Sequence, residues 1–523
     1  MQPTSWIRSW LEGAGAAILL TPGLIWLQLS RTHIDLYHRL LPLTTVDRAL
    51  ALDLVLLSLV VMLVVRALEA LERRSGLQKQ GGSGRSLILL LWVLWFGLLA
   101  ARTVAGLIVA QVLWWQQITT GRTFLLVAVV LGLVWLASGT WYRGTVRALR
   151  FALMLLGFCI FWMIPALVMA SLAHQPHDEA AFSKPVPAAA PHARIVWLLF
   201  DEMSYDQVFD HRWPGLDLPN LDKLRGQSVT FSNVQPDGFF TEDVIPSLLL
   251  GKPIIDVLGT PPGWMVYRTQ AKAPWERFDG GQTLFADAQR EGWTTGALGS
   301  YNPYCRILRD QLDFCWMDLQ SLPDHLSRDQ STWGNVVAPL KADWQRTVGR
   351  KPAKRATDPT SLETLGAVGA ADRLIGDTAI DLCFIHLPVP HPPGNYDRRT
   401  GRIGAGGSYI DNLALADRVL GHLLDDVGES GAGDRTTVIV SSDHSWRVWL
   451  WRHSFGWTPE DEAASGHGKF DPRPMLMVRF PGETTPTGIS RPVPLLSMHA
   501  LVEQLMAGRI EDPQQLETWA ATQ

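Results

Sequence analysis

Three apolar runs of the sequence end in side chains that can bind a metal ion. They deliver, in chain order, Asp201 and Glu202 after RIVWLLF (194–200), His386 and His391 at and beyond the end of AIDLCFIHL (379–387), and Asp443 and His444 after TTVIVSS (436–442). Carboxylates and imidazoles together suit a divalent metal. In open parallel sheets, ligands bind outside the carboxyl ends of the strands. The three runs therefore predict one metal-centred active site.

A hydroxyl that could act as a nucleophile lies in DGFFTEDVIPSLLLGKP (237–253), where Thr241 comes just before a helical pattern. The N-terminus of such a helix offers unpaired N–H groups to an anion. A metal-bound hydroxyl there can lose its proton at neutral pH and attack phosphorus or sulfur. The alternative is that Thr241 only caps the helix, with Glu242 and Asp243 as favourable first-turn acids. Taken alone, the segment favours the helix cap.

In the second part of the chain, strand-like apolar runs alternate with helical patterns, which predicts an α/β domain with a mainly parallel sheet. The expected strands are 194–200, 228–234, 293–298, 379–387, 436–442 and 474–480, and the expected helices are 218–227, 243–251, 281–291, 408–428 and 494–507. Residues 345–375 have no clear period and carry several basic side chains, so we expect an exposed insertion there.

The first part of the chain predicts a transmembrane domain. Of the 523 residues, 47% are hydrophobic and 18% charged, and this excess of apolar residues is concentrated before residue 173. Stretches long enough to cross a bilayer fall at about 11–30, 48–68, 87–112, 124–142 and 150–172. We therefore expect a five-helix transmembrane domain over 1–173, a Pro/Ala-rich linker over 174–193 and a catalytic domain over 194–523.

Charge and cysteine content indicate the compartment and exclude one class of partner. Arg and Lys cluster in the second and fourth loops between the expected spans, although the first loop also carries arginines, so the positive-inside rule favours a cytoplasmic N-terminus and an extracytoplasmic catalytic domain. The net charge of −4 gives no reason to expect nucleic acid as a partner. Cys305 and Cys315 flank a short polar segment and could form a disulfide in an oxidising compartment, or remain two buried thiols.

The order of these motifs resembles that of the alkaline phosphatase and sulfatase superfamily. The resemblance covers nearly all of 194–507. It rests on IVWLLFDEMSYD, LPNLDKLRGQSVTFSNV, TEDVIPSLLLGK, HLPVPHPP, SYIDNLALADRVLGHLL and HGKFDPRPMLMVRFPG. Each motif is weak by itself, and the signal comes from their order and spacing. The resemblance implies an alkaline phosphatase-like α/β fold.

The details resemble one branch of that superfamily. Sulfatases carry their modified Cys or Ser two residues before a proline, but Val244 stands there before Pro246. Thr241 instead matches the threonine of the phosphoethanolamine and phosphoglycerol transferases, of the lipoteichoic acid synthase type, which also have five membrane helices and an extracytoplasmic catalytic domain. Two features depart from that pattern: Asp201 replaces the usual glutamate, and the many cysteines of the phosphoethanolamine enzymes are missing. The donor head group therefore stays open between the two.

The resemblance implies a set of site residues. Asp201, Thr241, Asp443 and His444 would hold the metal, either zinc or manganese, and Thr241 would be the nucleophile. His391 and His467 would bind the phosphoryl oxygens or protonate the leaving group. His386 is expected to be a buried histidine with a structural hydrogen bond. The tryptophan- and arginine-rich segment 445–457 could either meet a lipid at the membrane interface or form a local core.

The expected function is that of a phosphotransferase in the bacterial cytoplasmic (inner) membrane, multi-pass, with its catalytic domain in the periplasm. It would move a phospholipid head-group phosphoryl unit through a phosphothreonine to a cell-envelope glycan or lipid. One alternative is a phosphoester or sulfoester hydrolase of the same fold. Another is an inactive membrane-tethered binding or scaffold protein, against which the presence of every metal position and of the threonine argues.

Overall fold

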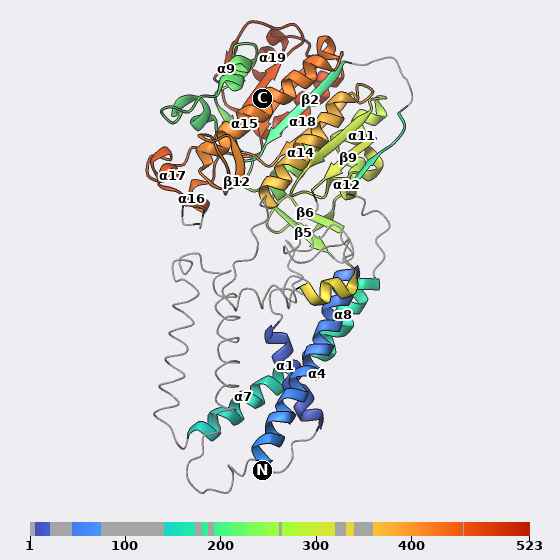
Figure 1. Cartoon of the computed structure of the whole chain (residues 1–523). Coiled ribbons are helices and arrows are strands. Elements are labelled where there is room, and N and C mark those ends of the chain that lie inside the picture. Colours follow the sequence, from blue (N-terminus) through green and yellow to red (C-terminus); the bar gives the residue numbers. More distant parts are fainter. Residues whose placement is uncertain are drawn as a thin grey trace. The chain divides into compact units, whose positions relative to one another are not determined.

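The computed structural model describes residues 6–20, 44–74, 141–172, 180–186, 193–260, 264–318, 331–338, 359–452, 454 and 456–523. The chain divides into two compact units (Figure 1). The described helices up to Leu172 belong to the first unit, together with residues 331–338. The second unit holds the other described residues, from 180 to the C-terminus.

The first unit is helical. Its described helices are α1 (Trp6–Leu20), α4 (Thr44–Arg74), α7 (Trp141–Gly157) and α8 (Ile160–Leu172). Small residues let these helices approach closely, because a Cβ atom at Gly15 or at Gly157 would lie 2.0 Å from a backbone oxygen of the neighbouring helix. The buried Glu12 of α1 pairs with Arg150 of α7 at 2.7 Å. Close glycine packing and one internal ion pair therefore join α1 to α7.

Two segments of the described helices are long and apolar enough to cross a membrane, Val46–Ala67 and Arg150–Met169, judged by length and composition alone. They overlap the expected spans 48–68 and 150–172. The described part of the chain thus contains two such helices and not the five that the sequence predicts. Residues 21–30, 87–112 and 124–140 of the other expected spans lie outside the described residues.

The second unit is built on a nine-stranded sheet. Its strands are β1 (Ala181–Ser183), β2 (Arg194–Phe200), β3 (Val229–Phe231), β8 (Thr295–Gly299), β9 (Phe314–Met317), β10 (Leu382–Leu387), β13 (Thr436–Ser442), β14 (Leu476–Arg479) and β15 (Thr487–Ile489). They lie in the order β1-β9-β8-β10-β2-β13-β14-β3-β15. β1 and β14 run antiparallel to their neighbours, and the other pairs are parallel. The predicted mainly parallel α/β sheet is confirmed.

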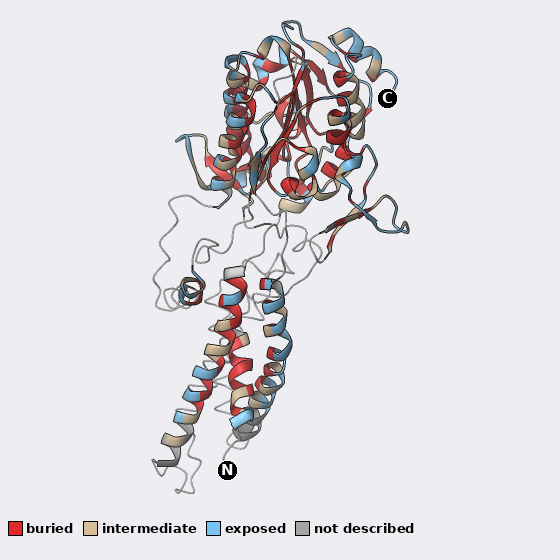
Figure 2. Ribbon diagram, turned by 90° about the vertical axis from the view of Figure 1, so that its right-hand side faces the viewer, coloured by how far each residue is buried: buried red, intermediate tan, exposed pale blue. Residues whose placement is uncertain are grey.

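Each face of this sheet is covered by helices, as the burial colours show (Figure 2). Ile195, Trp197 and Leu199 of β2 pack in one core with residues of α10 (Thr241–Leu250), α11 (Leu284–Arg290) and α18 (Met498–Met506). The alternate residues of β2 pack in a second core with α9 (Pro219–Arg225), α14 (Pro359–Gly376) and α15 (Tyr409–Glu429). Because successive side chains of a strand point to opposite faces, one fully buried strand supplies both cores.

Shorter elements complete the second unit. Three small sheets are formed by β11 (Gly394–Asp397) with β12 (Arg402–Gly407), by β4 (Val234–Gln235) with β16 (Val493–Pro494), and by β5 (Asp256–Thr260), β6 (Trp264–Arg268) and β7 (Glu276–Arg277). The shorter helices include η2 (Asp206–Asp210), α12 (Tyr304–Ile307), α16 (Val448–Trp451), α17 (Pro459–Ala464) and α19 (Pro513–Ala520).

The predicted exposed insertion at 345–375 is wrong from residue 359 onward, and residues 345–358 lie outside the described part of the chain. Residues Pro359–Gly376 form α14, whose buried face includes Ala367, Ala370 and Leu374. Alanines and glycines give this helix a weak apolar period, so the sequence pattern does not reveal it. The buried Arg194 of β2 donates hydrogen bonds to the carbonyl oxygens of Leu374 and Ile375 at the C-terminal end of α14, where a cation is favourable.

The predicted disulfide is present. Cys305 of α12 and Cys315 of β9 are joined, with their Cα atoms 5.6 Å apart. The bridge closes a short loop beside β8, the strand that lies next to β9 in the sheet.

We predict that replacing both Cys305 and Cys315 by serine lowers the free energy of unfolding by about 2–3 kcal/mol, because closing a loop of about ten residues removes that much entropy from the unfolded chain. Chemical denaturation of the two forms measures the difference. Cys159→Ser removes a free thiol of the helical unit and should leave the transition of the α/β unit unchanged. Equal stability of the double variant and the parent would contradict the prediction.

Candidate metal centre

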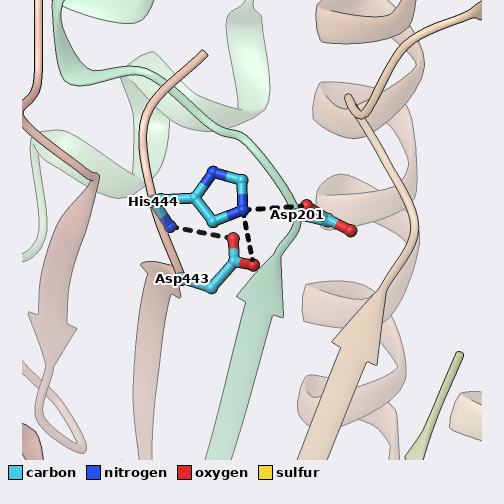
Figure 3. Close-up of side chains that lie close together, drawn as sticks. All are labelled: Asp201, Asp443 and His444. Atoms are coloured by element: carbon cyan, nitrogen blue, oxygen red, sulfur yellow. Dashed lines mark hydrogen bonds and ion pairs between the residues drawn. The ribbon is translucent and has the colours of Figure 1, made fainter. Parts of the chain in front are cut away.

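The side chains of the predicted site meet where three central strands end. β2 and β13 pair in parallel with Phe200 opposite Ser442, so the next residues, Asp201 and Asp443, leave the sheet side by side. β10 lies on the other side of β2, with Leu387 opposite Phe200. Asp201, Asp443 and His444 converge at this edge (Figure 3). The parallel register therefore brings together residues that lie more than 240 positions apart in the sequence.

Thr241 completes this group from the first turn of α10. Its hydroxyl Oγ1 donates a hydrogen bond to Asp443 Oδ2 at 2.8 Å and lies 3.3 Å from His444 Nε2. His444 Nε2 is also 3.1 Å from Asp443 Oδ2 and 3.8 Å from Asp201 Oδ1. All four side chains are buried. One imidazole nitrogen thus faces three oxygen atoms of the kind that bind a divalent metal.

The tautomer of His444 follows from its second ring nitrogen. Nδ1 lies 3.1 Å from the backbone carbonyl oxygen of Ser445. Because a carbonyl oxygen can only accept, Nδ1 carries a proton. Nε2 faces Thr241, Asp443 and Asp201: with a second proton it pairs with the carboxylate of Asp443, and with a metal bound it would present its lone pair to the ion instead. Metal-binding histidines are commonly oriented by such a bond to a carbonyl group.

The two carboxylates are stabilised unequally. Burial raises the pKa of Asp443, but the charge and hydrogen bond of His444, with a smaller contribution from Thr241, outweigh it and hold that pKa below its usual range. Backbone N–H groups of Glu202 and His444 also donate to Asp443 Oδ1. For Asp201, burial and then the negative charges of Asp443 and Glu202 raise the pKa, and Oδ1 is buried without a hydrogen-bond partner. The group therefore has a buried carboxylate oxygen that an added cation would satisfy.

This ligand set fits the divalent metal that the sequence predicts. Two carboxylates, one imidazole and one hydroxyl suit zinc and manganese alike. The structure also excludes one of the two interpretations of Thr241. The N-cap position of α10 is Phe240, and no side chain caps this helix. The alternative interpretation of Thr241 as a helix cap is therefore wrong.

A second group of charges lies beside the first and includes a residue that the sequence analysis did not place in the site, Arg447. Its Nε donates to the buried carboxylate of Glu202, its Nη1 to the carbonyl oxygen of Phe239 at 3.2 Å, and its Nη2 to His391 Nε2 at 3.1 Å. Trp451 Nε1 donates to the same carboxylate at 2.9 Å. Asp201, Glu202 and His391 are close enough to hold an ion, but the Arg447 guanidinium already supplies a positive charge to two of them.

The two predicted catalytic histidines are placed differently. His391 lies at the edge of the site with 30% of its side chain exposed, and burial lowers its pKa, so it is neutral at neutral pH. His467 has 81% of its side chain exposed and lies 3.7 Å from Glu462. Its backbone φ is positive, as are those of Gly466 and Gly468. Within the described residues, no contact joins His467 to the metal group.

His386 has the structural hydrogen bond that the sequence analysis expected. On β10, its Nδ1 lies 2.8 Å from the hydroxyl of Tyr304, and burial lowers its pKa to about 4. Asn302 Nδ2 also donates to that hydroxyl, so the tyrosine proton is available for His386 Nδ1. Nε2 then carries the ring proton and faces Asp201 Oδ2 at 3.9 Å. The structural hydrogen bond of His386 is thus the one with Tyr304, and its Nε2 lies beside Asp201 without a hydrogen bond.

Within the tryptophan-rich segment 445–457, one residue fits a local core and another fits a contact with lipid. Trp446 is buried and stacks on Tyr409 with ring centroids 4.1 Å apart, which fits a local core. Trp449 is 49% exposed and packs edge-on against Phe240, the residue before Thr241, which is 39% exposed. Aromatic surface is therefore present next to the proposed nucleophile.

No family model matches the sequence, and no curated protein matches it. Among solved structures, the chain is similar to an alkaline phosphatase superfamily protein from Vibrio parahaemolyticus, with 17% identity, 66% of this chain and 74% of that chain covered, and a TM-score of 0.39. The lipoteichoic acid synthase LtaP from Listeria monocytogenes has 13% identity, coverage of 62% and 75%, and a TM-score of 0.38. The PsFucS1 sulfatase from Pseudoalteromonas sp. has 15% identity, coverage of 61% and 68%, and a TM-score of 0.39.

The protein from Vibrio parahaemolyticus is named as a member of the alkaline phosphatase superfamily, whose motifs those of this chain resemble.

We predict that Asp443→Asn removes most of the bound metal and lowers the rate of turnover by several orders of magnitude, because Asp443 contacts both the imidazole ligand and the nucleophile. Thr241→Val should largely keep the metal, since Asp201, Asp443 and His444 remain. Elemental mass spectrometry of the purified proteins measures the metal. Asp434→Asn changes an exposed aspartate near the start of β13 and serves as the control. Metal content in Asp443→Asn equal to that of the parent would contradict this ligand assignment.

We also predict that Arg447→Met lowers the free energy of unfolding by about 3–5 kcal/mol, because it leaves the buried carboxylate of Glu202 without its cation. Adding Glu202→Gln to this variant should recover part of the loss. As the matched control, Arg452→Met breaks a more exposed pair with Glu462 and should cost at most about 1 kcal/mol. Chemical denaturation compares the four proteins. Similar losses for the Arg447 and Arg452 variants would show that the buried pair has no special role.

Proposed function

We propose that this protein is a membrane-anchored, metal-dependent phosphotransferase that uses Thr241 as its nucleophile. The donor is a phospholipid with a phosphoethanolamine or phosphoglycerol head group, and the acceptor is a cell-envelope glycan or lipid. The observation that carries the proposal is the position of Thr241 Oγ1, 2.8 Å from Asp443 Oδ2 and 3.3 Å from His444 Nε2. A threonine hydroxyl buried among metal-binding groups, and not used as a cap, suits a nucleophile.

In the first half-reaction, Thr241 Oγ1 forms a bond to the phosphorus of the donor, and the phosphoester bond to the diacylglycerol oxygen breaks. The hydroxyl proton passes to Asp443 Oδ2, its hydrogen-bond acceptor, and the departing diacylglycerol oxygen takes a proton from solvent. A divalent metal bound by Asp201, Thr241, Asp443 and His444 would lower the pKa of the Thr241 hydroxyl and stabilise negative charge on the phosphoryl oxygens. In the second half-reaction, an acceptor hydroxyl attacks the phosphorus and releases its proton to solvent. The bond from phosphorus to Thr241 Oγ1 breaks, and Thr241 takes back the proton from Asp443.

The neighbouring residues are assigned to the phosphoryl group. Arg447 holds the carbonyl oxygen of Phe239, two residues before Thr241, and thereby orients the segment that leads to the nucleophile. Its fixed charge favours an anion nearby. His391 lies at the edge of the site and accepts a hydrogen bond from Arg447 at Nε2, so Nδ1 carries the proton of the neutral ring and is the atom that would donate a hydrogen bond to a phosphoryl oxygen. His467 remains a proposed catalytic residue, although its side chain is exposed in this structure.

Two observations support a lipid donor. The first unit carries two helices that are apolar enough to cross a membrane, and many of its large side chains are exposed, including Leu63, Phe161 and Trp162. Next to the nucleophile, Phe240 and Trp449 expose aromatic surface, which suits an acyl chain or the membrane interface. With the loop charges of the sequence, we place the protein in the bacterial inner membrane as a multi-pass protein with its catalytic domain in the periplasm.

A hydrolase of the same fold is the alternative, because water could replace the acceptor in the second half-reaction. The two functions differ when no acceptor is present. A hydrolase continues to release both products, whereas a transferase stops after about one diacylglycerol per active site.

We predict that the full-length protein, incubated without acceptor in vesicles that contain phosphatidylethanolamine or phosphatidylglycerol, gains a covalent adduct on Thr241. The adduct keeps the head group of the donor, so its mass identifies that donor. Peptide mass spectrometry detects the adduct, and lipid analysis counts the diacylglycerol released.

Two variants control this experiment. Thr241→Val keeps the shape of the side chain but lacks the hydroxyl, so it should give no adduct. Thr241→Ser keeps the hydroxyl and should restore the adduct in part. Turnover by Thr241→Val at the rate of the parent would refute the nucleophile and leave a metal-bound water as the attacking group.

A further inference from the structure

A second group of metal-binding side chains lies outside the proposed catalytic site. It consists of Asp287 on α11 and of His499 and Glu503 on α18. One ligand atom from each of the three residues lies within 4.8 Å of the others. The group lies where α11 and α18 meet the C-terminal end of α10, so it joins three helices that cover one face of the central sheet.

The ring of His499 is oriented for binding a cation. Its Nδ1 lies 3.0 Å from the backbone carbonyl oxygen of Leu248 on α10. Because this oxygen only accepts, Nδ1 carries a proton, and the lone pair of the neutral ring is on Nε2. The ring also lies against Gly251, where an added Cβ atom would be 2.8 Å from His499 Cδ2. The position of the imidazole is therefore fixed by the end of α10.

Two carboxylates face Nε2. Glu503 Oε1 is 3.6 Å away, one helical turn along α18, and Asp287 Oδ2 is 4.0 Å away on α11. The other oxygen of Asp287, Oδ1, contacts Arg290, which leaves Oδ2 for His499. Tetrahedral zinc holds its ligands at about 2.0–2.1 Å, and therefore about 3.3 Å from each other. Small side-chain movements would bring the three atoms to those separations.

We propose that Asp287, His499 and Glu503 form a structural zinc site that fastens the C-terminal end of α10 to α11 and α18. Thr241 is the first residue of α10, and Leu248 follows seven residues later, about 10 Å along the helix axis. The zinc therefore lies away from the reacting atoms and fixes the helix that carries Thr241. Histidine and carboxylates are among the protein ligands of zinc, and a water molecule would supply the fourth ligand of the tetrahedron. The bond from Nδ1 to a carbonyl oxygen is the usual support for a histidine ligand.

A third group of similar composition, Asp372, His422 and Asp426, provides a comparison. The side chain of His422 is 50% exposed, whereas that of His499 is 14% exposed. Exposed histidine–carboxylate groups are common as simple ion pairs, in which a protonated imidazole replaces the metal. The more buried and oriented group is the one we assign to zinc.

The test counts zinc in the full-length protein purified in detergent, stripped with a chelator, equilibrated with Zn²⁺ and desalted. We expect the parent to hold one more zinc ion per chain than the variant Asp287→Asn with Glu503→Gln. Zn²⁺ should also raise the thermal midpoint of the parent by more than that of the variant, because a ligand that binds only the folded state stabilises it. The matched control, Asp372→Asn with Asp426→Asn, should keep the zinc content and the thermal shift of the parent.

The same comparison in an Asp443→Asn background separates this site from the catalytic one. The difference of one zinc ion should persist there, and it does not depend on whether Thr241 forms an adduct. Equal zinc content with and without Asp287 and Glu503 would overturn the proposal and leave an imidazolium ion pair. In the Asp443→Asn background, an equal thermal shift with and without the two carboxylates would overturn it as well.

Discussion

The site depends on one constraint, the burial of Asp201 and Asp443 side by side at the ends of two paired strands. The parallel register of β2 and β13 forces this arrangement, and two adjacent carboxylates away from water repel each other. Asp443 is stabilised by backbone N–H groups, His444 and Thr241. Asp201 keeps an oxygen without a hydrogen-bond partner. A divalent cation at this edge would resolve both problems, and it would also activate the threonine that already points there.

In the adjacent group, a cationic side chain of the protein balances a buried carboxylate. Glu202 follows Asp201 directly and is also buried, but the guanidinium of Arg447 and the indole of Trp451 satisfy its carboxylate. Arg447 then reaches the carbonyl oxygen of Phe239 and the ring of His391. One side of the site thus has a permanent positive charge, and the other has the ligands for a metal. A phosphoryl group between them would have cations on both sides.

Helix α10 runs from the site at the edge of the sheet to a contact with helix α18. Its N-terminal residue, Thr241, contacts the metal ligands, while Leu248 near its other end accepts a hydrogen bond from His499 of α18. Its apolar side chains are buried in one of the two cores of the sheet. The proposed nucleophile therefore stands on a helix that is packed at both ends, which favours a fixed geometry for the proposed reaction.

The sequence by itself determined the features that depend on local pattern. Apolar runs that end in Asp201, in His386 and in Asp443 predicted strands and a common site, and the cysteine pair was found as a disulfide. Tertiary structure decided what local pattern does not encode. α14 is buried through alanines whose period is weak, and Arg447 enters the site only because the chain folds back to place it against Glu202 and His391. The hydroxyl of Thr241 could be told from a helix cap only once Asp443, 202 residues away, lay within hydrogen-bond distance.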